Sequence, residues 1–328
     1  MNESTRASDR LAAEAAAVLA RLGGVAPSPM RTVDGAPGGV HRAARRGGGI
    51  EFAEHREYGP GDDLRHLDWR AYARNDRYYV KRFEQEAHAS ITLLVDTSSS
   101  MDIHSDDSGA IRSAGGSGAD GGAAVDKLGA IKLLCAALAM LVVRRGDAIG
   151  LTFAGRPLDL MASGGEAHLR RVLDALAGLE AQGPTGFDGL DRRLLRGPER
   201  RGAVVAVSDL LGEPAAVLAP LAQLRRVGPQ VMVLQCLHPR ELDLAFDGAV
   251  QLHCGETDRR DLIDPRAMRA TYSELMQAHI ADVRDRAVQA GLRHQLVDLG
   301  VGTDMHLRSV FRVLGRAGRQ PGGWRRRA

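Results

Sequence analysis

Aromatic residues are scarce in this chain, and their scarcity limits how its core can be built. Only 4% of the 328 residues are Phe, Trp or Tyr, so Ala, Leu and Val must fill the interior. Seven of the thirteen aromatic residues lie within 51–86, interspersed with nine acidic and seven basic residues. We interpret this segment as a small unit whose rings pack together and whose charges are satisfied locally.

Cysteines and long apolar runs are also few. The three cysteines are odd in number and widely spaced, which favours free thiols in a reducing compartment over a disulfide framework. The longest apolar run, Leu133 to Val143, has 11 residues, whereas a membrane span needs about 20. Acids and arginines are scattered through Ser4 to Leu22, unlike the apolar centre of a secretory signal. We therefore expect a soluble cytoplasmic protein without a membrane span.

Net charge gives little support for a nucleic-acid partner. The formal net charge is only +3, although Arg312 to Ala328 contains six arginines and no acid. Basic chain ends are usually just solvated. Binding of nucleic acid or anionic surfaces through the arginine-rich ends is therefore kept as the alternative function, and nucleic acid is not the favoured partner.

Strands and helices alternate through most of the chain. This pattern predicts an α/β fold, a doubly wound and mainly parallel sheet, with a small N-terminal collar that is β-rich or irregular. The predicted strands are 91–95, 148–154, 203–207, 230–237, 249–253 and 294–299, and the predicted helices are 4–23, 127–145, 166–179, 214–227, 265–290 and 305–314.

Composition divides the chain into four parts. We expect an N-terminal helix and flexible arm over 1–49, the charged aromatic collar over 50–88, and the α/β domain over 89–315. A Gly, Ser and Asp rich insertion at 102–126 interrupts that domain and should be flexible. A basic tail over 316–328 ends the chain.

The segment Ile91 to Met101, I-T-L-L-V-D-T-S-S-S-M, holds the candidate functional residues. A strand buried on both faces is followed by oxygen donors at every second position, namely Asp96, Ser98 and Ser100. Ligands bind outside the carboxyl ends of such strands, and a hard cation such as Mg²⁺ needs six oxygens. Thr185, in a glycine-bounded loop, and Asp209, after the strand 203–207, are the best placed further donors. The predicted metal residues are Asp96, Ser98, Ser100, Thr185 and Asp209, with Mg²⁺ as the ion and Mn²⁺ or Ca²⁺ as alternatives.

Other chemistry finds less support in the sequence. The strand-end serines could simply make local hydrogen bonds to the backbone. The chain lacks a nucleophile elbow and a phosphate-binding loop with lysine, and Ser98 stands where an aspartyl phosphatase needs a second Asp, so we expect no enzymatic activity. Cys236, His238, His253 and Cys254 do not have the spacing of a zinc site and are better explained as core thiols and strand-end histidines.

The set D-x-S-x-S, a distant Thr and a strand-terminal Asp resembles the metal-ion-dependent adhesion site of von Willebrand factor A domains. The resemblance covers residues 89–314. It implies an ion held mainly by neutral hydroxyls, with the carboxylates mostly one shell further out. An acidic side chain from a client protein can then complete the coordination of the ion.

The sequence ahead of this site is similar to the bacterial domain-of-unknown-function family fifty-eight. The resemblance rests on G-I-E-F-A-E-H-R-E-Y-G-P-G-D-D-L-R-H-L-D-W-R-A-Y-A-R, then Y-V-K-R-F-E-Q-E and L-L-V-D-T-S-S-S-M. It implies a MoxR-type AAA+ ATPase as partner. The function we expect is a non-enzymatic, metal-dependent protein-interaction adaptor in chaperone-like assembly or maturation of client proteins, without a small-molecule substrate. The insertion at 102–126 departs from the pattern, and some relatives carry membrane spans that this chain lacks.

Overall fold

The computed structural model of the chain divides into two compact units. One contains residues 1–30 and 89–318, and the other contains residues 31–88 and 319–328. The residues that the structure describes are 3–22, 50–59, 67–75, 77–85, 90–105, 111–112, 126–156, 159–183, 187, 202–244, 250–253 and 260–316.

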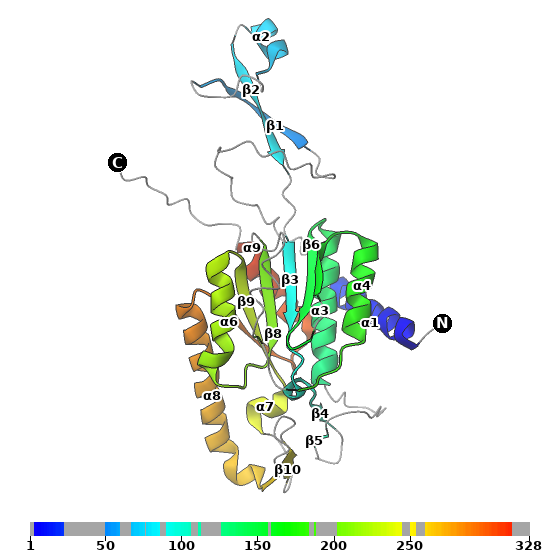
Figure 1. The fold of residues 1–328 in the computed structure, drawn as a ribbon, viewed down its shortest axis with the longest axis vertical. Coiled ribbons are helices and arrows are strands. Elements are labelled where there is room, and N and C mark those ends of the chain that lie inside the picture. Colours follow the sequence, from blue (N-terminus) through cyan, green and yellow to red (C-terminus); the bar gives the residue numbers. More distant parts are fainter. Residues whose placement is uncertain are drawn as a thin grey trace. The chain divides into compact units, whose positions relative to one another are not determined.

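A six-stranded sheet forms the centre of the larger unit (Figure 1). The strand order is β12-β9-β8-β3-β6-β7, and every neighbouring pair is parallel except β6 with β7. The mainly parallel α/β sheet predicted from the sequence is therefore confirmed. The strands are β3 (Ser90–Val95), β6 (Ala148–Phe153), β7 (Asp159–Ser163), β8 (Ala203–Ser208), β9 (Gln230–Leu237) and β12 (Arg293–Asp298).

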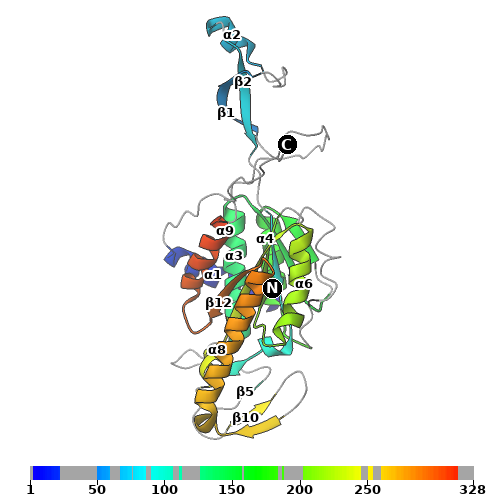
Figure 2. The ribbon, with the colours of Figure 1, turned by 90° about the vertical axis from the view of Figure 1, so that its left-hand side faces the viewer.

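Helices cover both faces of this sheet, as Figures 1 and 2 show from two directions. One face carries α1 (Glu3–Arg21), α3 (Lys127–Arg144), α4 (Glu166–Ala177) and α9 (Thr303–Arg316). The other carries α6 (Pro214–Val227) and α8 (Pro265–Gln289). The N-terminal helix α1 packs against α3, α4 and α9, so it belongs to the core of this unit.

The central strand β3 supplies both hydrophobic layers. Ile91, Leu93 and Val95 point into the layer that contains α3, and Leu94 points into the layer beneath α6. Each of these side chains is at most 2% exposed. A strand that is covered on both faces needs apolar residues at successive positions, which is why the segment reads as a continuous apolar run.

Short elements lie at the carboxyl edge of the sheet, where the candidate site is found. They are the 3₁₀ turn η2 (Ser99–Met101), the pair β4 (His104–Ser105) and β5 (Ile111–Arg112), helix α7 (Pro239–Asp243), and the pair β10 (Val250–His253) and β11 (Arg260–Ile263). The predicted strand 249–253 corresponds to β10, but it pairs with β11 in a separate antiparallel sheet. Only residues 254–259 separate β10 from β11 in the chain, which is too short for the crossover that a parallel pair requires.

The smaller unit contains an antiparallel strand pair and one short helix. Strand β1 (Ile50–Glu57) pairs with β2 (Tyr79–Gln85), and α2 (Trp69–Asn75) lies between them in the chain. The ring of Tyr72 stacks on Tyr78 with centroids 4.5 Å apart, and Tyr58 meets Tyr78 edge-on at 6.4 Å. These three tyrosines of the collar therefore pack on one another.

Several predictions fall outside the described residues. They concern Thr185 with its loop, Cys254, most of the arm within 1–49, most of the insertion at 102–126, and the basic tail over 317–328. They stay predictions. Of the helices that the structure describes, none is long and apolar enough to cross a membrane.

The packing of α1 gives a first prediction. Leu11 is 8% exposed and lies in the main core cluster, so Leu11→Ala should lower the free energy of unfolding by about 2 kcal/mol through lost burial and a residual cavity. Arg10→Ala, at an exposed position of the same helix, should change it by less than about 0.5 kcal/mol. Urea unfolding followed by circular dichroism measures both. Equal effects of the two variants would contradict the observed packing of α1.

Candidate metal site at the carboxyl edge of the sheet

The pairing of β3 with β8 brings two of the predicted metal residues together. Val95 lies opposite Val207, and the Asp96 backbone N–H donates to the Val207 carbonyl over 2.9 Å. Asp96 follows β3 and Asp209 follows β8, so both carboxylates emerge at the same edge. They are 0% and 1% exposed respectively. Ionised groups at such depth require compensating partners.

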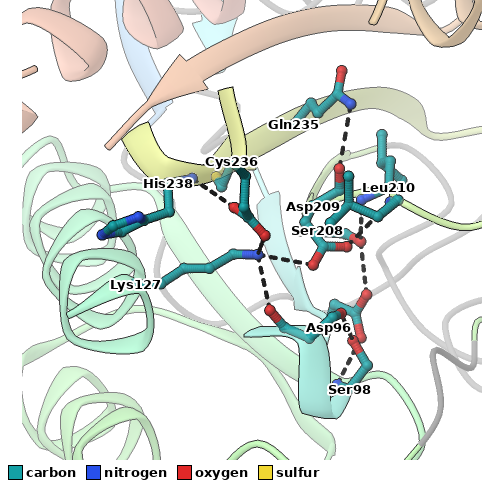
Figure 3. A network of polar contacts seen from close by, with 12 residues as sticks. Asp96, Ser98, Lys127, Ser208, Asp209, Leu210, Gln235, Cys236 and His238 are labelled. Atoms are coloured by element: carbon teal, nitrogen blue, oxygen red, sulfur yellow. Dashed lines mark hydrogen bonds and ion pairs between the residues drawn. The ribbon is translucent and has the colours of Figure 1, made fainter. Parts of the chain in front are cut away.

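The Asp96 carboxylate is held by two hydrogen bonds, one to each oxygen. Its Oδ1 accepts from the Ser98 backbone N–H over 2.9 Å, and its Oδ2 accepts from the Ser208 hydroxyl over 2.6 Å (Figure 3). Sequence reasoning missed Ser208 as a site residue. The available signal was its position, because it is the last residue of β8 and directly precedes Asp209.

The hydroxyl groups of Ser98 and Ser100 lie side by side. Their Oγ atoms are 3.0 Å apart, and the η2 turn that begins after Ser98 sets this spacing. Met101, the last residue of that turn, is fully buried and anchors the loop in the core. Two oxygens at adjacent octahedral positions around Mg²⁺, each about 2.1 Å from the ion, lie about 3.0 Å apart. The two serines therefore have the spacing of neighbouring ligands.

Thr185 lies outside the described residues, but the start of its loop is fixed beside the serines. The Ser99 backbone N–H donates to the Gly183 carbonyl over 2.8 Å, and the Gln182 backbone N–H donates to the Thr97 carbonyl over 2.7 Å. The chain thus runs along the serine loop two residues before Thr185. The structure brings Asp96, Ser98, Ser100 and Asp209 together, and the role of Thr185 stays a prediction.

A buried lysine, Lys127, is the main site residue that sequence reasoning missed. Its side chain extends from the first position of α3 into the polar cluster and is 0% exposed (Figure 3). Its ammonium group donates to Asp209 Oδ2 over 2.9 Å, to Glu241 Oε1 over 2.7 Å and to the Ser100 carbonyl over 2.9 Å. The sequence signal was weak, since a lysine at the start of a helix is usually solvent-exposed.

The charges of this cluster do not cancel. The carboxylates of Asp96, Asp209 and Glu241 face the single ammonium group of Lys127, which leaves two negative charges uncompensated when all are ionised. Burial raises the pKa of the Asp96 carboxyl and that of the Glu241 carboxyl. Burial alone would lower the pKa of Lys127, but the Asp209 and Glu241 charges outweigh it and raise that pKa. A bound divalent cation would balance the excess charge.

Asp209 is positioned by an unusual backbone conformation. The next residue, Leu210, is buried and has φ of 53°, in the left-handed region that a branched residue rarely adopts. The Leu210 N–H donates to the Ser208 hydroxyl over 3.1 Å, and its carbonyl lies 2.8 Å from Nε2 of His279 on α8. Gln235 also donates to the Asp209 carbonyl. These contacts hold the strained turn in place.

The structure offers little for a zinc site. Among the described residues, no group of three or more His, Cys, Asp or Glu side chains is arranged to hold a metal ion. Cys236 is fully buried, and burial raises the pKa of its thiol well above the usual value, which disfavours the metal-binding thiolate. His238 caps α7, because its Nδ1 accepts from the Arg240 backbone N–H over 3.1 Å. A cation here would depend on the hydroxyl oxygens of the serine loop and not on thiolate or imidazole ligands.

Comparison with known sequences relates the chain to a family without an assigned function. The model of the family described as "Protein of unknown function DUF58" matches residues 54–282. Uncharacterized protein Rv1480 of Mycobacterium tuberculosis and uncharacterized protein Mb1516 of Mycobacterium bovis are each 31% identical to the chain over 259 residues. The match covers 76% of this chain and 75% of each relative.

Two solved structures give a looser likeness. The conserved hypothetical protein BatB from Bacteroides thetaiotaomicron is 14% identical, with a TM-score of 0.41 over 70% of this chain and 98% of that one. An aerotolerance-related membrane protein from Bacteroides fragilis is 12% identical, with a TM-score of 0.42 over 70% of this chain and 100% of that one. Likeness at this level supports no conclusion about function.

The buried lysine gives a prediction about stability. Lys127→Met should lower the free energy of unfolding by about 3–5 kcal/mol, because it leaves Asp209 and Glu241 buried without their counter-ion. The matched control is Lys132→Met on the same helix, where a half-buried ammonium group donates to the Ala177 carbonyl over 3.1 Å. The control should cost about 1 kcal/mol. Chemical denaturation of both variants measures the difference, and equal losses would contradict the role given to Lys127.

Proposed function

Since this chain belongs to the DUF58 family, whose function is unknown, we propose its function from the geometry of its candidate metal site. The protein is a non-enzymatic, Mg²⁺-dependent protein-interaction adaptor. The observation that carries this proposal is the pair of serine hydroxyls 3.0 Å apart, at the same end of the sheet as two buried carboxylates whose oxygens already accept hydrogen bonds.

The proposed ion is held mainly by neutral oxygens. Ser98 and Ser100 bind it directly, and Thr185 adds a third hydroxyl from the loop after Gly183. Asp96 already accepts hydrogen bonds from Ser98 and Ser208, and Asp209 accepts one from Lys127. These carboxylates therefore contact the ion through bound water and not directly. Such an ion keeps much of its positive charge and attracts an acidic side chain from a partner.

The strand arrangement supports the proposed von Willebrand factor A-like character. The strand that precedes the serines lies in the middle of the sheet, and a single antiparallel strand, β7, occupies one edge. Asp96 and Asp209 follow the carboxyl ends of two neighbouring parallel strands, which is where ligands bind in sheets of this type. Mg²⁺ fits the serine spacing, and Mn²⁺ or Ca²⁺ are the alternatives.

The proposed partners follow from the family resemblance and the chemistry of the ion. A MoxR-type AAA+ ATPase is the proposed working partner, and a protein client supplies the acidic side chain. The pair would act in assembly or maturation of that client, in the cytoplasm. The alternative, binding to nucleic acid or anionic surfaces, rests on the arginine-rich ends, and the basic tail over 317–328 lies outside the described residues.

Calorimetry tests ion binding directly. The intact protein should bind one Mg²⁺, Ser98→Ala should bind it at least about tenfold more weakly, and the double variant Asp96→Ala, Ser98→Ala should show no binding. Ser90→Ala is the matched control, because Ser90 is the first residue of β3 and lies at the end of the strand away from the site. Equal binding by the intact protein and the double variant would refute the site.

Complex formation tests the adaptor role. A MoxR-type ATPase of the source genome and its acidic client protein should co-elute with the intact protein in Mg²⁺. The client should bind Ser98→Ala at least about tenfold more weakly, because its acidic contact to the ion would be lost. Analytical size exclusion in Mg²⁺ and in a chelator measures this. Ser90→Ala should behave as the intact protein does. Complex formation that does not depend on the ion or on Ser98 would show that the site serves another partner.

A further inference from the structure

We infer that Lys127 is a positioning residue that couples the ion-binding loop to helix α7. This inference rests on the proposed function, because it concerns the same site. The ammonium group of Lys127 joins three elements: the loop that holds Ser98 and Ser100, the end of β8 at Asp209, and α7 at Glu241. The ammonium group would not touch the ion itself. Lys127 therefore acts through the Ser100 carbonyl and the two carboxylates that it holds.

The geometry leaves the ammonium group no spare hydrogen bond. Lysine has three N–H donors, and in Lys127 they meet three acceptors at 2.9, 2.9 and 2.7 Å. The ammonium nitrogen is completely buried, so water cannot replace a lost partner at low cost. A shift of the Ser100 carbonyl on ion binding would therefore either break its bond to the ammonium group or pull that group, which would stretch its bonds to Asp209 and Glu241.

The location of Lys127 also runs against local helix preference. It is the first residue of α3, where the positive end of the helix dipole disfavours a cation. The preceding residue, Asp126, is the N-cap but makes no capping hydrogen bond with its side chain. A lysine at a position that the helix dipole disfavours indicates that tertiary contacts require it. Here these contacts are its hydrogen bonds to the Ser100 carbonyl, Asp209 and Glu241.

Glu241 transmits the contact into α7 and from there to α8. One Glu241 oxygen accepts from Lys127, and the other accepts from the His238 backbone N–H over 2.7 Å, which closes the capping box of α7. The Tyr272 hydroxyl donates to the Glu241 carbonyl over 2.7 Å. Arg269 of α8 pairs with Asp243 at 2.6 Å. Movement of Glu241 would therefore displace α7 and the part of α8 that contacts it.

A purely structural counter-ion would behave differently from a coupling residue. It would lower stability when removed, but the response of α7 to the ion would not change. Hydrogen exchange measured with and without saturating Mg²⁺ separates the two roles. The reporting amides are those of Leu242 and Leu244, which donate to the His238 and Arg240 carbonyls within α7.

The experiment compares the intact protein with Glu241→Gln, which leaves Lys127 bound to Asp209 and to the loop. In the intact protein, Mg²⁺ should change exchange at the two α7 amides by at least about threefold. Glu241→Gln should lose that change while calorimetry still detects Mg²⁺ binding. Lys127→Met, where it folds, should behave as Glu241→Gln does. Asp243→Asn is the matched control, because it removes an α7 carboxylate that contacts Arg269 and not Lys127.

The outcomes distinguish this inference from the proposed function. An unchanged α7 response in Glu241→Gln, or no α7 response in an intact protein that binds Mg²⁺, would overturn the coupling and leave the adaptor proposal standing. If the intact protein binds no Mg²⁺, the proposed function fails. Hydrogen exchange without the ion then tests whether Lys127 and Glu241 still hold the serine loop in place. Glu241→Gln should then still speed exchange of the Met101 and Asp102 amides in the loop. Unchanged rates there would overturn the coupling of the loop to α7 through Lys127.

Discussion

A completely buried ammonium group constrains the architecture around it. Lys127 is stable in the interior only because Asp209, Glu241 and the Ser100 carbonyl all reach the same point. Helix α3 must therefore begin at the carboxyl edge of the sheet, and α7 must return to that edge after β9. The rest of α3 is apolar around most of its surface and packs between the sheet and α1, so the helix cannot slide to release the lysine.

The carboxyl end of the sheet has two parts with different properties, one that stabilises the fold and one that has hydroxyl groups for an ion. The half around Lys127 is already neutralised in part by an internal cation and is closed to water. The half around Ser98 and Ser100 keeps neutral hydroxyls beside the buried Asp96 carboxylate. When Asp96 is ionised, its negative charge lies next to the oxygens with the spacing of metal ligands, and a divalent ion there would complete the charge balance.

Sequence patterns anticipated the sheet and part of the site because those signals are local. The apolar run before Asp96 and the strand before Asp209 placed both carboxylates at one sheet edge, and the structure agrees. The partners of Lys127 could not be found in this way, because they lie 82 and 114 positions away. Strand β7 also escaped detection, since its half-exposed residues lack a continuous apolar run. Strand β10 was found, but its pairing with β11 depends on the hairpin and not on its own sequence.

The conformation of Leu210 has a consequence for mutational tolerance. A buried leucine normally accepts isoleucine or valine with small loss, because what matters is apolar volume. At position 210 the left-handed backbone reverses that ranking, since a second branch at Cβ would clash, whereas glycine would fit the backbone and lose only packing. The backbone angle therefore limits position 210 as much as its apolar surroundings do, and the substitutions tolerated there should resemble those of a turn.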